Sequence, residues 1–244
     1  MRVKKEAAIG ILVAAILILV FTGIIVYQRR SGRNALALRI AELSPRGGPP
    51  QTIEDLRAAI SAYEAQIEQH VRDAAQTGIY WKILATRLQD RGLHHEALEA
   101  LEQALYYYPE DPSLHYQIGV SAGIAAKSAY AGQDQERYYG LSERGYLRAI
   151  ELDPRYARPR YGIGVLYVFE LNRPLEAVPH LLRYLEITTN DVDAMFVLAR
   201  AYYMAQEYQP AVDIYDEIIR ITKDADKRAE ALNNKQFVLD ALYG

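Results

Sequence analysis

The chain has 244 residues, with 28 Lys and Arg against 31 Asp and Glu, and it contains no cysteine. The formal net charge of −3 gives no general attraction to nucleic acid, so no nucleic-acid partner is expected. The lack of cysteine excludes disulfides, thiolate metal sites and cysteine nucleophiles. Apolar residues recur at spacings of three and four, and strand-like alternation is rare, which predicts an all-α protein.

The first element in chain order is an apolar run. Residues 1–6 form a basic N-terminus, and residues 7–27 carry no charged side chain. A helix of this length, rising about 1.5 Å per residue, spans a hydrocarbon core of roughly 30 Å. No small-residue cleavage site follows, so the pattern favours an uncleaved transmembrane anchor over a signal peptide, with a buried soluble helix as the alternative. Basic residues flank both ends of the run, which leaves the membrane orientation open.

Two elements are expected after the anchor. Residues 28–51 are predicted to be a tether, because this segment ends in the Pro- and Gly-rich run SPRGGPP. Residues 52–77 are predicted to hold a leading helix. Thr52 is its expected N-cap, and Asp55 stands where a capping box has its acidic partner.

A repeated ending then organises the rest of the chain. Similar segments begin at residues 104, 149, 184 and 218, and they read ALYYYPED, AIELDPRY, YLEITTND and IIRITKDA. Their spacings of 45, 35 and 34 fit a 34-residue unit with eleven extra residues in one copy and one in the next. In an all-helical chain, a period of 34 indicates a solenoid of helix–turn–helix units. Small residues should mark the positions where paired helices cross: 85 with 97, 119 with 142, 164 with 177, and 199 with 211.

The segments WKILATRL, GLHHEALEALEQALYYYP and AIELDP resemble the tetratricopeptide repeat. The resemblance implies a right-handed superhelix over residues 78–244. Its four units would be 78–111, 112–156, 157–191 and 192–225, followed by a capping helix at 226–244. The second unit fits the pattern least well, because His115 replaces its Trp and an insertion follows at about 127–139. That insertion is expected either to protrude as a hairpin or to act as a spacer.

The resemblance also implies a concave groove in which a protein or peptide binds. The groove positions carried over from the family are Lys82, Thr86, Tyr116, Val120, Arg158, Tyr161, Val165, Phe196 and Arg200. The aromatic residues at one slot of three successive units predict anchors for an apolar or amphipathic peptide. The alternative explanation is that Tyr is simply common at that slot in the family. Of the positions with which some members bind a C-terminal carboxylate, only Lys82 and Arg158 match, which argues against that ligand.

No catalytic, cofactor or metal motif emerges. His94-His95-Glu96 is interpreted as a solvated turn, and the chain has no phosphate loop, HExxH motif or nucleophile elbow. We therefore expect a non-enzymatic interaction scaffold or chaperone-like adaptor. The resemblance to single-anchor bacterial repeat proteins implies a role in envelope assembly, at the inner membrane and facing the periplasm. The alternatives are a cytosol-facing receptor for targeting peptides and a regulatory subunit of a membrane-bound enzyme.

Overall fold

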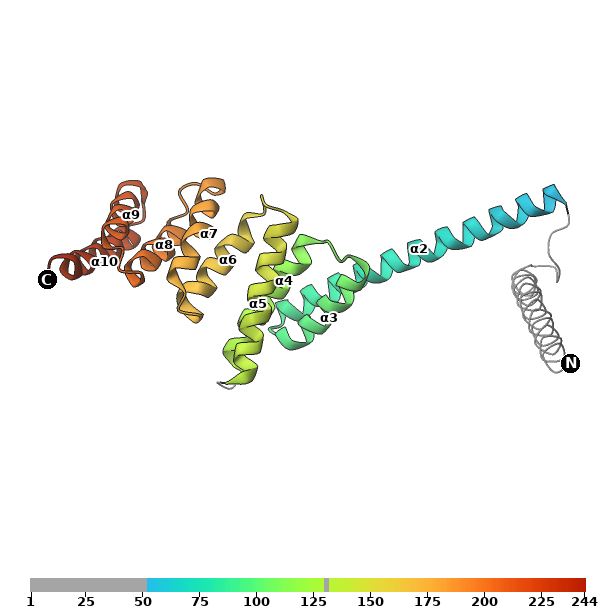
Figure 1. The fold of residues 1–244 in the computed structure, drawn as a ribbon, viewed down its shortest axis with the longest axis horizontal. Coiled ribbons are helices and arrows are strands. Elements are labelled where there is room, and N and C mark those ends of the chain that lie inside the picture. Colours follow the sequence, from blue (N-terminus) through green and yellow to red (C-terminus); the bar gives the residue numbers. More distant parts are fainter. Residues whose placement is uncertain (1–51, 130–131) are drawn as a thin grey trace, which may run out of the picture. The chain divides into compact units, whose positions relative to one another are not determined.

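The computed structural model describes residues 52–129 and 132–244, and every regular element within these ranges is helical (Figure 1). The predicted all-α class is therefore confirmed for these residues. The predicted anchor at 7–27 and tether at 28–51 lie outside them. Among the described helices, none combines the length and the apolar character needed to cross a bilayer.

The helices follow one another in chain order, separated by short turns. They are α2 (Ile53–Asp90), α3 (His94–Tyr107), α4 (Pro112–Ser128), α5 (Gln133–Leu152), α6 (Ala157–Val165), α7 (Pro174–Ile187), α8 (Val192–Met204), α9 (Tyr208–Ile221) and α10 (Ala225–Tyr243). One π-helical turn, η1 (Leu166–Glu170), directly continues α6.

Helix α2 begins as predicted but does not end as predicted. The Thr52 hydroxyl accepts a hydrogen bond from the Asp55 amide at 3.0 Å, which is the expected cap. A helix boundary at residue 77 is wrong, because α2 runs without interruption to Asp90. The segment contains no proline, and at Gly78 the lack of a side chain lets the helix approach its neighbour: an added Cβ would lie 2.6 Å from Tyr107. The chain divides into two compact units inside α2, at residues 71 and 72, and each unit is treated by itself below.

The second unit, residues 72–244, is an array in which each helix packs against the next (Figure 1). Its interior consists of three successive apolar clusters rather than one core. Leu101 lies in the first cluster with Trp81 packed against its edge, Leu181 lies in the second, and Ile218 lies in the third. Packing of each repeat against its neighbouring repeats is what a helix–turn–helix solenoid requires.

Small residues let the paired helices cross closely. Ala85 and Ala97 are fully buried, in agreement with the predicted first crossing. At the second crossing, the Ser142 hydroxyl donates to the Gly119 carbonyl at 2.7 Å. The two helix backbones also approach closely at Gly145, which the sequence did not single out. A Cβ on Gly145 would lie 2.7 Å from the backbone nitrogen of Gly119.

The extra residue of the third unit is accommodated by the π-turn. Gly92 and Gln206 have φ values of 72° and 63°, and each is the fifteenth residue of its predicted unit. Asn172, with a φ of 51°, is the sixteenth residue of the third unit, so the additional residue of this unit lies before the turn. There the Leu171 N–H donates to the Leu166 carbonyl five residues back, at 3.0 Å.

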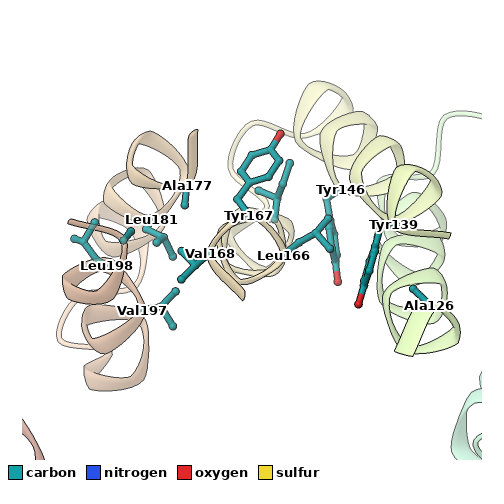
Figure 2. Packing of buried hydrophobic residues seen from close by; sticks show 12 residues of the cluster. Ala126, Tyr139, Tyr146, Leu166, Tyr167, Val168, Ala177, Leu181, Val197 and Leu198 are labelled. Atoms are coloured by element: carbon teal, nitrogen blue, oxygen red, sulfur yellow. The ribbon is translucent and has the colours of Figure 1, made fainter. Parts of the chain in front are cut away.

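The turn around η1 also forms the middle of the array. Leu166 points toward Tyr146 on α5, and Val168 points toward Leu181 and Val197 on α7 and α8 (Figure 2). One short helical segment thus joins the second repeat to the fourth. Because a helix turns by roughly 100° per residue, side chains two positions apart point in nearly opposite directions, so Leu166 and Val168 contact neighbours on opposite sides.

The insertion at about 127–139 contacts the repeats on both sides. Lys127 forms an ion pair with Glu170 at 2.7 Å, and the Tyr139 hydroxyl donates to the same carboxylate at 2.7 Å. On the other side, the Tyr138 hydroxyl lies 2.9 Å from the Nδ1 atom of His95. The insertion therefore links the first repeat to the third, rather than protruding without contacts.

Candidate partner groove

The predicted aromatic anchors occupy equivalent places on α4, α6 and α8. Tyr116, Tyr161 and Phe196 are all half-buried. Each ring packs against a tyrosine of the helix that follows. The ring centroids are 6.0 Å apart for Tyr116 and Tyr146, 5.3 Å for Tyr161 and Tyr184, and 6.1 Å for Phe196 and Tyr215. These distances are typical of aromatic pairs, so each half-buried anchor ring is held in position by a more buried tyrosine.

The aliphatic positions lie beside the anchors. Val120 and Val165 are half-buried and pack, with Tyr116 and Tyr161, against the same central cluster. Phe196 packs instead against the third apolar cluster, which contains Ile218. The structure thus packs four of the predicted groove residues against one apolar cluster and the fifth against the next cluster.

The predicted polar positions at the N-terminal end are already engaged. The Lys82 ammonium lies 2.6 Å from Asp111 and 5.0 Å from the centre of the Tyr108 ring. Asp111 caps α4 by accepting from the Ser113 amide at 2.9 Å. Burial alone would raise the pKa of Asp111, but the bonds from Lys82 and from backbone amides outweigh it and lower that pKa. Lys82 therefore stabilises the turn between repeats. Exposed Thr86 bonds to the Lys82 carbonyl at 3.1 Å.

Tyrosine hydroxyls bond to acidic side chains along the array. The Tyr184 hydroxyl donates to Asp191 at 2.6 Å, and Asp191 also caps α8 through the Ala194 amide. Burial, together with this hydrogen bond, raises the pKa of Tyr184 to about 12. Burial also raises the pKa of Tyr161, and the negative charge of Asp191 adds to this effect. Tyr161 and Tyr184 are therefore neutral phenols at physiological pH.

Arg158 lies at the entrance of α6 and is exposed. Its charge acts on the neighbouring Tyr156, whose ring centroid is 5.3 Å from that of Tyr116. Burial raises the pKa of Tyr156, and Arg158 opposes that effect. This places a cation beside the tyrosine whose ring packs on the first aromatic anchor.

A cavity of about 350 Å³ lies at the C-terminal end of the groove. Its lining contains two predicted residues, Phe196 and Arg200, and the Arg200 guanidinium lies 5.2 Å from the centre of the Phe169 ring. The remaining lining residues are Val197, Tyr203, Tyr215, Glu230, Asn234, Phe237 and Val238. Aromatic walls with one cation and one carboxylate suit an amphipathic side chain or peptide segment.

Sequence reasoning missed the contribution of α10 to this cavity. Glu230 and Asn234 are the fifth and ninth residues counted from residue 226, so they occupy the slots that hold Phe196 and Arg200 in the preceding unit. The polar composition of the last helix indicates only a cap. Applying the same slot count to it would have identified both residues.

No site for a metal is evident in the described part of the chain. Within residues 52–129 and 132–244, no three His, Cys, Asp or Glu side chains come together in a metal-binding arrangement. The interpretation of His94-His95-Glu96 as a solvated turn is wrong, because these residues begin α3 and His94 is half-buried. The Nδ1 atom of His95 lies 2.9 Å from the Tyr138 hydroxyl.

Comparison with known proteins identifies the fold. No known family model matches the chain. A TPR repeat-containing protein of Borreliella burgdorferi is 22% identical over 207 residues, which cover 84% of this chain and 87% of the relative. MamA from Desulfovibrio magneticus superposes with a TM-score of 0.54 at 15% identity, over 69% of this chain and 98% of that chain. A thermophilic TPR protein of Thermus thermophilus gives a TM-score of 0.53 at 19% identity, over 74% of this chain and 91% of that one.

These likenesses and the helix–turn–helix order agree with each other. The array has the fold of an all-helical tetratricopeptide-repeat superhelix, as the sequence resemblance predicted. At sequence identities of 15% and 19%, the solved structures are evidence for the fold only. The function must therefore be argued from the groove.

Proposed function

We propose that residues 72–244 are a protein–protein interaction scaffold whose groove binds a peptide segment of a partner protein. One observation carries the proposal: three half-buried rings, Tyr116, Tyr161 and Phe196, recur at one slot of successive first helices. Aromatic residues dominate the binding energy of many interfaces, where truncating one typically costs more than about 2 kcal/mol. Rings already held by a neighbouring tyrosine lose little freedom on binding, which favours affinity.

We also propose that the scaffold is tethered to a bacterial inner membrane through residues 7–27 and that it takes part in envelope assembly from the periplasmic side. The uncharged 21-residue run and the bacterial relative support this placement. A cytosol-facing receptor for targeting peptides and a regulatory subunit of a membrane enzyme are the competing functions. A reporter fused after Gly244, active in only one compartment, decides between the two orientations.

The groove is tested best by a substitution that keeps each ring in place. A photoreactive phenylalanine analogue is introduced singly at Tyr116, Tyr161 and Phe196, and the cells are irradiated. Because an aromatic replaces an aromatic, the packing against the supporting tyrosine is retained. We expect adducts with the same partner from all three positions.

Tyr106 is the matched control, because it is a tyrosine on a second helix and is 81% exposed. It should give no specific adduct. Equal labelling from Tyr106, or no labelling from any groove position, would place the binding surface elsewhere.

A further inference from the structure

The N-terminal part of α2 carries large apolar side chains that are exposed. Ile53, Leu56, Ile60 and Ile67 are 65%, 46%, 55% and 62% exposed. An isolated exposed apolar residue needs no explanation, but a row of them on one helix indicates an interaction surface. The row begins directly after the capped start of the helix at Thr52.

The spacing of this row has a specific period. Steps of three and four residues alternate through positions 53, 56, 60, 63, 67, 70 and 74, which we call the heptad stripe. It contains the four exposed apolar residues together with His70, Ala74 and the half-buried Tyr63. Its mean period is 3.5 residues, whereas a helix lying on a globular core shows a broader face with a period near 3.6. A strict seven-residue repeat keeps a narrow seam facing one partner helix and imposes a left-handed supercoil.

We propose that residues 53–74 pair with the same segment of a second copy of this chain, forming a parallel two-stranded coiled coil. The first position of each heptad holds Ile at 53, 60 and 67, and the fourth position of the first heptad holds Leu56. Ile at the first position with Leu at the fourth is the combination that favours two parallel strands.

The rest of the segment agrees with this pairing. The opposite side of the helix carries Ala58 and Ala65, both exposed, which are good helix formers without apolar bulk.

The absence of cysteine makes a direct test possible, because any introduced thiol is unique. Leu56→Cys is made in the full-length chain, oxidised in the cells that express it and analysed on a non-reducing gel. A disulfide requires Cα atoms within about 4.4–6.8 Å, so it forms at position 56 only if that residue faces its counterpart in register. We expect a covalent dimer. Ala58→Cys, two residues away on the outer side, should stay monomeric.

A second pair of variants tests whether the dimer forms through the heptad stripe. Adding Ile60→Asp to Leu56→Cys should abolish the disulfide, because a carboxylate would be buried in the seam. Adding Ala65→Asp on the outer side should leave it intact. If Leu56→Cys gives no dimer, the stripe is covered by another segment or protein, or pairs in another register, and the proposal fails. It also fails if the dimer survives Ile60→Asp, since association would then come from another part of the chain.

Discussion

Gly145 is the residue at which the packing of the array can be tested most directly. On α5 it lies against the backbone of α4, where an added Cβ would be 2.7 Å from the Gly119 nitrogen and 2.8 Å from the His115 carbonyl oxygen. Both atoms belong to a helix backbone and cannot rotate away, so Gly145→Ala must separate the two helices.

The expected cost follows from two opposing effects. Overpacking a well-packed interior costs about 1–3 kcal/mol, and two backbone contacts place this site at the upper end. Replacing Gly by Ala inside a helix returns about 1 kcal/mol through backbone entropy and propensity. The net loss should be about 2 kcal/mol, which lowers Tm by roughly 4–8 °C in a domain of this size.

The matched control is Gly140→Ala on the same helix. There the added Cβ would meet only the end of the flexible Arg144 side chain, at 3.4 Å. The propensity gain is then unopposed, so this variant should melt about 2 °C higher. Thermal unfolding followed by circular dichroism on residues 52–244 measures both. Equal shifts for the two variants would mean that α4 and α5 do not approach as closely as described.

Three further predictions concern charges and the C-terminal end. Asp111→Asn retains a capping side chain but removes the ion pair with Lys82. Because the pKa of Asp111 is lowered in the folded chain, its stabilisation is present above the unfolded value of 3.8 and lost as the pH falls through the folded value. Urea unfolding should therefore show a deficit of about 0.5 kcal/mol at neutral pH that disappears in acid. Burial and the hydrogen bond to Glu170 raise the pKa of Tyr139 to about 12. Its neutral form therefore contributes stability that is fully present below the unfolded pKa of 10.0 and is lost as the pH rises through about 12. Tyr139→Phe should remove one late-ionising phenol from the phenolate absorbance titration. Val238 is 2% exposed, so Val238→Ser should speed hydrogen exchange in α9 and α10 but leave exchange in α3 unchanged. Leu232 is 51% exposed, so Leu232→Ser should not speed exchange in α9 and α10.

The repeat architecture was predictable because it depends on spacing alone. Apolar and small residues must recur where neighbouring helices touch, so Ala85 and Ala97 mark the first crossing in the sequence itself. The aromatic slot of Tyr116, Tyr161 and Phe196 follows from the same count. Each of these inferences uses a local pattern that every unit repeats.

What could not be predicted depends on contacts between units. The spacing of 35 reveals one extra residue in the third unit, but spacing cannot say where a helix absorbs it, and the π-turn at Leu166–Glu170 was therefore missed. Gly145 was missed because several glycines look alike until the approach of another backbone separates them. The cavity was only partly foreseen, because Glu230 belongs to a helix whose overall composition is polar although one of its faces lines the groove.

The position of Trp81 gives this protein an internal reporter of local unfolding. It is the single tryptophan beside 20 tyrosines, and it packs at the edge of the first apolar cluster. Selectively excited indole fluorescence therefore observes only the N-terminal repeat, whereas the circular dichroism signal averages over all the helices. In a quasi-one-dimensional array the two ends need not melt together. A fluorescence transition displaced from the dichroism transition would measure, without any label, how far unfolding of one repeat is coupled to the next.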